Sequence, residues 1–146
     1  MSKLSGTRVV DLSLFLPGPM MTSMLGDHGA EIIKIEPPGG DPARQMEPFE
    51  EGQSVWFRNI NRGKQSVVLD LKQKDNLQKL YRLVEESDIF VEAFRPGVAN
   101  RLAIDYETLS AINPRIIYCS ISAFGQDGPL AHHPAHDLAV EAFAGF

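Results

Sequence analysis

The sequence is poor in the features that mark secreted, membrane-bound and disulfide-rich proteins. It has one cysteine, Cys119, among 146 residues, so no internal disulfide can form and a reducing compartment is expected. Its first residues contain no long apolar run of the kind found in a secretory signal. No stretch of roughly 18 apolar residues is present to cross a membrane. These absences predict a cytoplasmic protein that has no membrane partner.

Excess positive charge and phosphate-binding loops are also missing. The net charge is −5, which disfavours nucleic acid as a partner. Neither G-x-G-x-x-G nor G-x-x-x-x-G-K-[ST] occurs, so the backbone loops that hold pyrophosphate are absent. Three histidines cluster in "HHPAH", but Pro134 breaks any helix that would align them on a metal. We therefore expect no nicotinamide, flavin or metal cofactor, and neither an NAD-dependent dehydrogenase nor an NTPase.

What the sequence does contain is the alternation of strands and helices typical of an α/β domain. Its 43% apolar and 23% charged residues are ordinary globular values. Apolar runs rich in β-branched residues predict strands at residues 7–11, 31–36, 65–71, 88–94 and 114–122. Helices are predicted within residues 16–30, 72–87, 105–113 and 134–146, and an ordered excursion without clear period at 41–63. This order predicts a mainly parallel sheet with helices on both faces.

Cations are the residues that could hold an anionic ligand in such a fold. Open α/β sheets bind ligands beyond the carboxyl ends of their strands, and without a glycine-rich loop any phosphate must be held by side chains. The candidates are Arg58, Arg62, Lys64, Lys72, Arg95 and Arg101. For any one of them, an ordinary solvated surface position is the more common role of a cation. Arg95, in the stretch "FRPG", is the best of these candidates, because an aromatic residue beside an arginine can sandwich a purine ring.

Several stretches together resemble one family. They are "LSGTRVVDLS", "PGPMMTSMLGDHGAEIIKIEPPGGDPAR", "NINRGKQSVVLDLK", "VEAFRPG", "INPRIIYCSISAFGQDGP" and "HDL". They occur in the order found in family III CoA-transferases, a superfamily that also contains the α-methylacyl-CoA racemases and the carnitine and bile-acid CoA-transferases. The resemblance covers nearly the whole chain, and the ordered set is more specific than any single stretch.

The resemblance implies a Rossmann-like large domain and a small domain, in two chains threaded through each other as an interlocked homodimer. It implies acyl-CoA and carboxylate substrates, with CoA lying along the carboxyl ends of the strands. Positions that match CoA contacts of the family are Leu16, Leu69, Lys72, Phe94, Arg95 and Arg101. One departure is Pro37, which stands where many members carry an arginine that contacts the nucleotide. Family members are more than twice as long, so we expect residues 1–146 to be the N-terminal part of the CoA-binding large domain, without the small domain and the C-terminal return.

Three functional hypotheses follow from the resemblance. In the first, the protein is an acyl-CoA transferase whose nucleophilic aspartate lies beyond Phe146 and forms an aspartyl-CoA intermediate. In the second, it is a 2-methylacyl-CoA racemase in which His136 works with that later aspartate. A helix N-terminus disfavours a charged imidazole, which suits a base, although a surface role for His136 is equally compatible with the sequence. In the third, the 146-residue chain is an inactive CoA-binding fragment.

Overall fold

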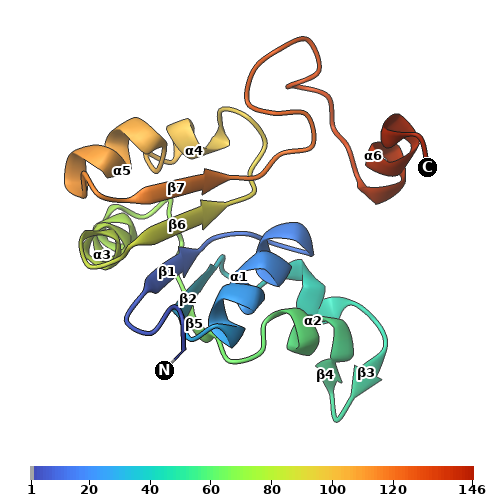
Figure 1. Cartoon of the computed structure of the whole chain (residues 1–146), viewed down its shortest axis with the longest axis horizontal. Coiled ribbons are helices and arrows are strands. Elements are labelled where there is room, and N and C mark those ends of the chain that lie inside the picture. The colour runs from blue at the N-terminus through green and yellow to red at the C-terminus, as the bar shows by residue number, and fades with distance from the viewer. Residues whose placement is uncertain (1) are drawn as a thin grey trace.

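A five-stranded parallel sheet forms the centre of the molecule (Figure 1). The computed structural model describes residues 2–146. The strands lie in the order β5-β2-β1-β6-β7, and every neighbouring pair is parallel. Taken in chain order this is the 3-2-1-4-5 arrangement of a Rossmann fold. The strands are β1 (Arg8–Asp11), β2 (Glu31–Glu36), β5 (Gln65–Val68), β6 (Ile89–Glu92) and β7 (Ile117–Ser120). All five predicted strands are confirmed. β2 has the predicted bounds, and the other four are shorter than their apolar runs.

Helices cover both faces of the sheet, as the alternating pattern predicted. On one face lie α3 (Lys74–Glu85) and α5 (Tyr106–Ile112), whose Leu80 and Leu109 join the larger apolar cluster. On the other face lies α1 (Pro17–Asp27), which packs against a smaller cluster around Val91. Successive side chains of a strand point to opposite faces, so β1, β2, β6 and β7 contribute to both clusters. The predicted helix 105–113 begins where Asp105 accepts a hydrogen bond from the backbone N–H of Thr108 at 3.0 Å.

The excursion between β2 and β5 is ordered and carries elements that the sequence pattern did not reveal. They are the 3₁₀ helix η1 (Pro42–Gln45), the hairpin of β3 (Phe49–Glu50) and β4 (Gln53–Ser54), and α2 (Val55–Ile60). A further short helix, α4 (Val98–Arg101), follows the "RPG" turn. These elements are too short to show a helical or strand period. The excursion lies on the same side of the sheet as α1 (Figure 1).

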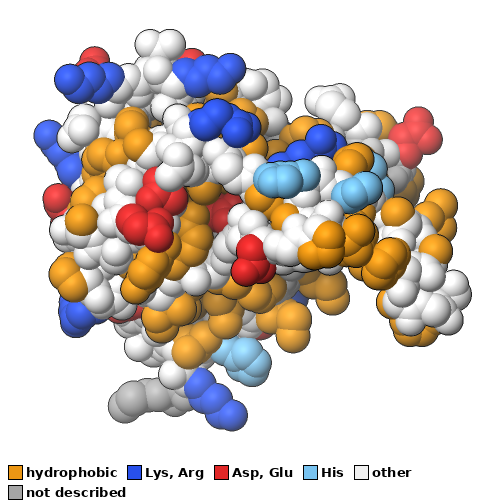
Figure 2. All heavy atoms as spheres, turned by 90° about the horizontal axis from the view of Figure 1, so that it is seen from above, with side chains coloured by type: hydrophobic (Ala, Val, Ile, Leu, Met, Phe, Trp, Pro, Cys, Tyr) orange, Lys and Arg blue, Asp and Glu red, His pale blue; other side chains and the backbone are white. Residues whose placement is uncertain are grey.

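The last helix, α6 (Asp137–Ala144), lies apart from the sheet (Figure 1). None of its residues is buried, and Phe143 contacts the rest of the molecule through an edge-to-face pair with Phe124, at 5.3 Å between ring centroids. Its exposed apolar residues include Leu138 and Phe143, at 80% and 69%. In Figure 2 this helix is the projection at the right, and much of its surface is apolar. Within residues 2–146, no helix has the length and apolar character needed to cross a membrane.

Candidate functional site

A pocket of about 200 Å³ opens at the carboxyl ends of four neighbouring strands. Each of the loops that follow β1, β2, β5 and β6 contributes part of its wall, and this is the edge at which open α/β sheets bind ligands. Most of the lining is apolar, and its charged residues are the buried Glu36 and the more accessible Asp70 and Lys72. The lining residues are Leu12, Leu14, Ile35, Glu36, Pro37, Pro38, Leu69, Asp70, Leu71, Lys72, Phe94 and Leu102.

Three of the residues predicted to contact a ligand lie in this pocket. Leu69 is buried in its floor, Phe94 is half-buried, and Lys72 is exposed at the rim. They come from two loops that are separated by the whole of α3, and the parallel sheet brings them to one edge. Pro37 also lines the pocket, so the place where an arginine was expected is an apolar wall that Pro38 extends.

The other three predicted residues lie next to the pocket lining in the chain. Leu16 is half-buried in the loop after β1, directly before α1. Arg95 follows Phe94 and is exposed. Arg101 ends α4 immediately before Leu102, and its guanidinium lies beside Gly97, where an added Cβ would be 3.5 Å from Nη1. Gly97 has φ = +80°, which favours glycine and fixes the turn after Arg95.

The structure separates the six candidate cations into two groups. Lys72, Arg95 and Arg101 are exposed, and within residues 2–146 they form no ion pair. The cations of "RNINRGK" are instead all paired: Arg58 with Glu50, Arg62 with Asp27, and Lys64 with Asp11. The hypothesis that residues 58–64 hold a phosphate is therefore not supported, because their charges already have internal partners.

Lys64 is the clearest case, because it belongs to a buried network. Its ammonium lies within 3.0 Å of four acceptors, namely Asp11 Oδ2, Pro19 O, Thr22 Oγ1 and Asn61 Oδ1. An ammonium has three N–H bonds, so no donor is left for a ligand. Burial lowers the pKa of Lys64, and the Asp11 carboxylate opposes that shift. Burial would raise the pKa of Asp11, but Lys64, Lys34 and two hydroxyl donors outweigh it and lower that pKa.

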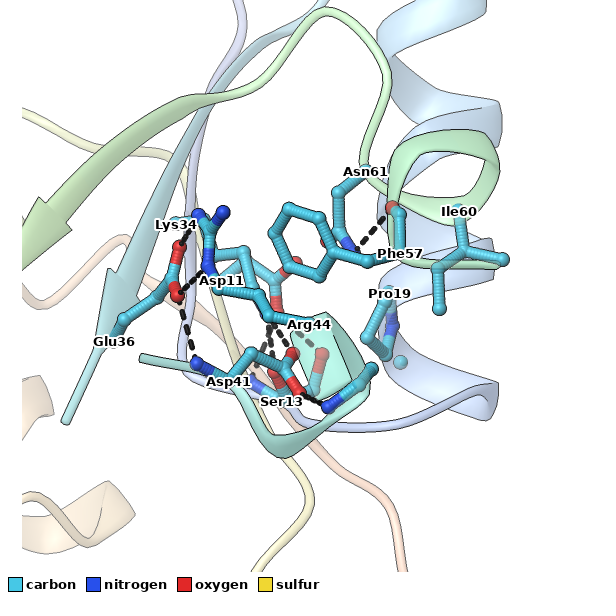
Figure 3. A network of polar contacts seen from close by, with 12 residues as sticks. Asp11, Ser13, Pro19, Lys34, Glu36, Asp41, Arg44, Phe57, Ile60 and Asn61 are labelled. Carbon is cyan, nitrogen blue, oxygen red and sulfur yellow. Dashed lines mark hydrogen bonds and ion pairs between the residues drawn. The ribbon is translucent and has the colours of Figure 1, made fainter. Parts of the chain in front are cut away.

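Two further ion pairs fasten the turn after β2 (Figure 3). Lys34, which is 1% exposed, lies with Nζ 2.9 Å from Asp41 Oδ2 and donates a hydrogen bond to Ser13 O at 2.8 Å. The contact with Asp41 is an ion pair without a well-aligned hydrogen bond. Arg44 donates two hydrogen bonds to Glu36, at 2.6 and 2.7 Å.

The same turn fixes the ionisation of Glu36. Burial raises the pKa of Glu36, but hydrogen bonds from Arg44, Ser66 and the Asp41 N–H outweigh it and hold the pKa at about 2. The carboxylate is therefore charged at neutral pH, and its hydrogen bonds hold the backbone that carries Pro37 and Pro38. Sequence reasoning missed this network. Its signal was the pair of charged residues Lys34 and Glu36, which share one face of β2 with Ile32.

A second, more polar pocket of about 590 Å³ lies on the excursion. Its lining includes Arg44, Arg58 and Arg62, each of which is paired with a carboxylate. The Arg44 guanidinium also lies 3.9 Å above the centroid of the Phe57 ring. The positive charge of this pocket is therefore balanced by the protein itself, and the pocket of about 200 Å³ remains the better candidate site.

His136 and Cys119 lie outside both pockets. His136 is the exposed residue directly before α6, and its side chain makes no capping hydrogen bond. Asp137 occupies the first turn of that helix, where a negative charge is favourable. Cys119 is half-buried and packs against the smaller apolar cluster, and burial raises the pKa of its thiol. Among residues 2–146, no group of three or more potential ligands is arranged to hold a metal ion.

Comparison with known proteins places this arrangement in a family. A family model described as CoA-transferase family III matches residues 4–146. The chain belongs to CoA-transferase family III. The family membership and the mainly parallel α/β fold predicted from the sequence are both confirmed.

Relatives of this family III chain are transferases in several organisms. Acetyl-CoA:oxalate CoA-transferase of Acetobacter aceti is 50% identical over 141 residues, which is 96% of this chain and 36% of that protein. Succinyl-CoA:glutarate CoA-transferase of Mus musculus is 40% identical over 147 residues, or 99% of this chain and 34% of that protein. The chain therefore spans a little more than a third of the length of these relatives.

Solved structures agree with this assignment. A CAIB/BAIF family protein from Brucella suis superimposes with a TM-score of 0.94 at 38% identity, covering 99% of this chain and 39% of that one. A hypothetical protein from Mycobacterium tuberculosis superimposes with a TM-score of 0.93 at 40% identity, covering 99% and 40%. The sheet and its loops are thus shared with longer chains of the same family.

Proposed function

We propose that this chain is the N-terminal part of the CoA-binding large domain of an acyl-CoA transferase. The complete enzyme moves CoA between an acyl-CoA thioester and a carboxylic acid, and acts as a homodimer. The observation that carries the proposal is the apolar pocket at the carboxyl edge of the sheet, with exposed cations beside it, in a chain of CoA-transferase family III. The exposed apolar side chains of α6 support the proposal that further parts of the protein cover this helix.

The pocket suits the nucleotide end of CoA. Its apolar walls of Pro37, Pro38 and Leu69 accommodate a flat ring, and Phe94 offers an aromatic face. Lys72, Arg95 and Arg101 supply positive charge beside it for the phosphates, because arginine pairs with phosphate in a bidentate manner and lysine acts as a point charge. Side chains thus replace the glycine-rich loop that the sequence lacks.

The transfer itself uses an aspartate that we place beyond Phe146. Its carboxylate attacks the thioester carbonyl and displaces the CoA thiolate, which gives a mixed anhydride. The thiolate then attacks the aspartyl carbonyl, releases the first acid and leaves an aspartyl-CoA thioester. The acceptor carboxylate attacks this thioester, and the thiolate returns to the new acyl group and regenerates the aspartate. CoA must stay bound throughout, which is the task of the pocket.

Calorimetry on the full-length protein tests the binding part of the proposal. Arg95→Met and Lys72→Met should each weaken CoA binding by roughly ten- to a hundredfold, because each removes a charge-assisted contact. Arg82→Met is a matched control, since Arg82 lies in the last turn of α3, which leads into the amino end of β6 and so lies away from the pocket. A wild-type protein that releases no heat with CoA, or equal weakening by Arg82→Met, contradicts the proposed site.

Chemical trapping tests the reaction. Acyl-CoA followed by hydroxylamine should convert one aspartate beyond residue 146 to a hydroxamate, detected by mass spectrometry. If instead the protein exchanged the α-hydrogen of a 2-methylacyl-CoA with solvent deuterium, and His136→Ala abolished that exchange, the racemase hypothesis would replace the transferase. Turnover by the 146-residue chain alone would refute the placement of the nucleophile beyond it.

A further inference from the structure

Three adjacent strands end in buried carboxylates that hold the loops of the pocket. The exposed fractions of Asp11, Glu36 and Glu92, at the ends of β1, β2 and β6, are 0%, 1% and 2%. Each carboxylate accepts a hydrogen bond from a backbone N–H in the loop that follows its strand. The donors are Ser13 N at 2.9 Å, Asp41 N at 2.8 Å and Phe94 N at 2.7 Å.

In the part of the chain that the structure describes, Glu92 differs from the other two because it forms no ion pair. Asp11 pairs with Lys64 and Glu36 with Arg44, whereas within residues 2–146 no ion pair involves Glu92. Burial of an unpaired carboxylate is costly, so the fold gains little stability from this residue. Its presence therefore points to a role other than stability.

The geometry around Glu92 indicates what that role is. Glu92 itself does not line the pocket, but Phe94, whose N–H it binds, does. On the far side, the backbone N–H of Val98 donates to Arg95 O at 3.1 Å, and Gly97 completes that turn with its positive φ. The segment of Phe94 and Arg95 is thus held at both ends, by the Glu92 carboxylate before it and by the "RPG" turn after it.

We infer that Glu92 is a positioning residue, which sets the Phe94 ring and the Arg95 side chain in place at the pocket through its hydrogen bond to the Phe94 N–H. The inference rests on the proposed function, in which this pocket takes CoA. In this role Glu92 acts through Phe94 and is not itself a contact of CoA. Its contribution is preorganisation: the two side chains need not be ordered when CoA binds.

Substitutions of Glu92 in the full-length protein test the inference. Glu92→Met keeps the length of the side chain and removes the acceptor, so the Kd for CoA should rise about tenfold, the loss of one hydrogen bond. Glu92→Gln retains a carbonyl oxygen that can accept from the Phe94 N–H, so binding should stay within about threefold of wild type. In turnover, Glu92→Met should raise KM for acyl-CoA and leave kcat and KM for the acid unchanged, as expected for a uniform binding effect.

Two further variants separate positioning from general destabilisation. Val84→Ala creates a cavity under α3 in the larger apolar cluster and should lower stability without changing the Kd for CoA. Replacing Phe94 by phenyllactic acid turns its amide into an ester, which removes the N–H donor and keeps both side chains. This ester should weaken CoA binding about as much as Glu92→Met, and it provides the test if that variant does not fold.

The outcomes distinguish this inference from the proposed function. A wild-type protein that ignores CoA overturns the proposed function, and the inference with it. A wild-type protein that binds CoA, with unchanged affinity in Glu92→Met or in the ester, overturns the inference alone. Equal weakening by Val84→Ala would also overturn it, because the effect would then be one of stability.

Discussion

The two faces of the central sheet are filled in different ways. Under α3 and α5, the sheet buries a continuous apolar cluster that includes Val10, Phe90 and Leu80. Under α1 and the excursion, the apolar cluster is small, and buried lysines and carboxylates fill the remaining space. Both faces belong to the same strands, because alternate side chains point to opposite sides. A parallel sheet can therefore be held to its covering elements by apolar packing on one face and by buried ion pairs on the other.

The charged face connects segments that apolar packing does not hold. Lys64, at the end of the excursion, pairs with Asp11 of β1. Arg44 of η1 pairs with Glu36 of β2, and Lys34 pairs with Asp41. Each pair joins the excursion or its first turn to a strand. The comparison predicts that removing one side chain lowers the free energy of unfolding on both faces, and that the loss depends on pH or salt only on the charged face.

The largest effect should come from Lys64→Met. This change leaves Asp11 buried without its closest cation, and such a loss typically costs about 3–5 kcal/mol. Urea denaturation followed by circular dichroism measures the free energy of unfolding. A loss below about 1 kcal/mol would show that the pair behaves like a surface pair.

The second largest loss in the free energy of unfolding is expected on the apolar face, from Leu80→Ala. Leu80 is fully buried in the larger cluster, and truncation of a buried leucine costs about 2–5 kcal/mol. The same urea experiment applies. The free-energy loss in Leu80→Ala should not depend on pH, because neither leucine nor alanine ionises. The loss in Lys64→Met should depend on pH, because Lys64 and Asp11 are both ionisable.

Acid should weaken the charged face through Glu36. Its pKa in the folded protein, about 2, lies below the ordinary value of 4.5, so its contribution to stability is present above about 4.5 and is lost as pH falls towards 2. Arg44→Met removes the main donor to Glu36. The stability difference between wild type and Arg44→Met should therefore narrow as pH falls through this range, measured as thermal melting at a series of pH values. A constant difference would contradict the assignment of the low pKa to Arg44.

The smallest effect should come from Arg62→Met at the edge of the same face. Arg62 and Asp27 are about half exposed, at 53% and 49%, so water already solvates both charges. Exposed pairs contribute about 0–1 kcal/mol, and raising the salt concentration should reduce even this. The change also serves as the matched control for Lys64→Met, since both remove one cation from the same short segment.

The contrast between the faces also explains what the sequence could predict. The five strands and the long helices were predicted because runs such as "RVVD" and the stripe of Leu77, Leu80 and Val84 carry a period. The excursion was predicted only as ordered chain, because its elements are short and its contacts with the sheet are ion pairs. Lys34 and Asp41 are seven residues apart in a turn, and no periodic pattern encodes such a pair.

The candidate site was predictable to a different degree. Leu69, Lys72 and Phe94 were named from the family resemblance, and the structure brings them to one pocket. The walls of Leu12 and Pro38 could not be derived from the sequence, because they come from loops whose meeting depends on the strand order. The role of "RNINRGK" was overestimated for a related reason. A cluster of cations in a sequence does not show that Asp11, Asp27 and Glu50 lie opposite them.

The enclosure of Lys34 and Lys64 has a consequence for chemical modification. Activated acyl groups react with uncharged, accessible lysine amines, and these two amines are buried and held by carboxylates and carbonyls. Lysines at exposed positions, such as Lys72 and Lys79, have amines that are accessible to solvent. Acetylation of the folded protein should therefore modify the exposed lysines and not Lys34 or Lys64. Acetylation of Lys34 or Lys64 would show that this part of the protein had unfolded, at least locally, before it reacted.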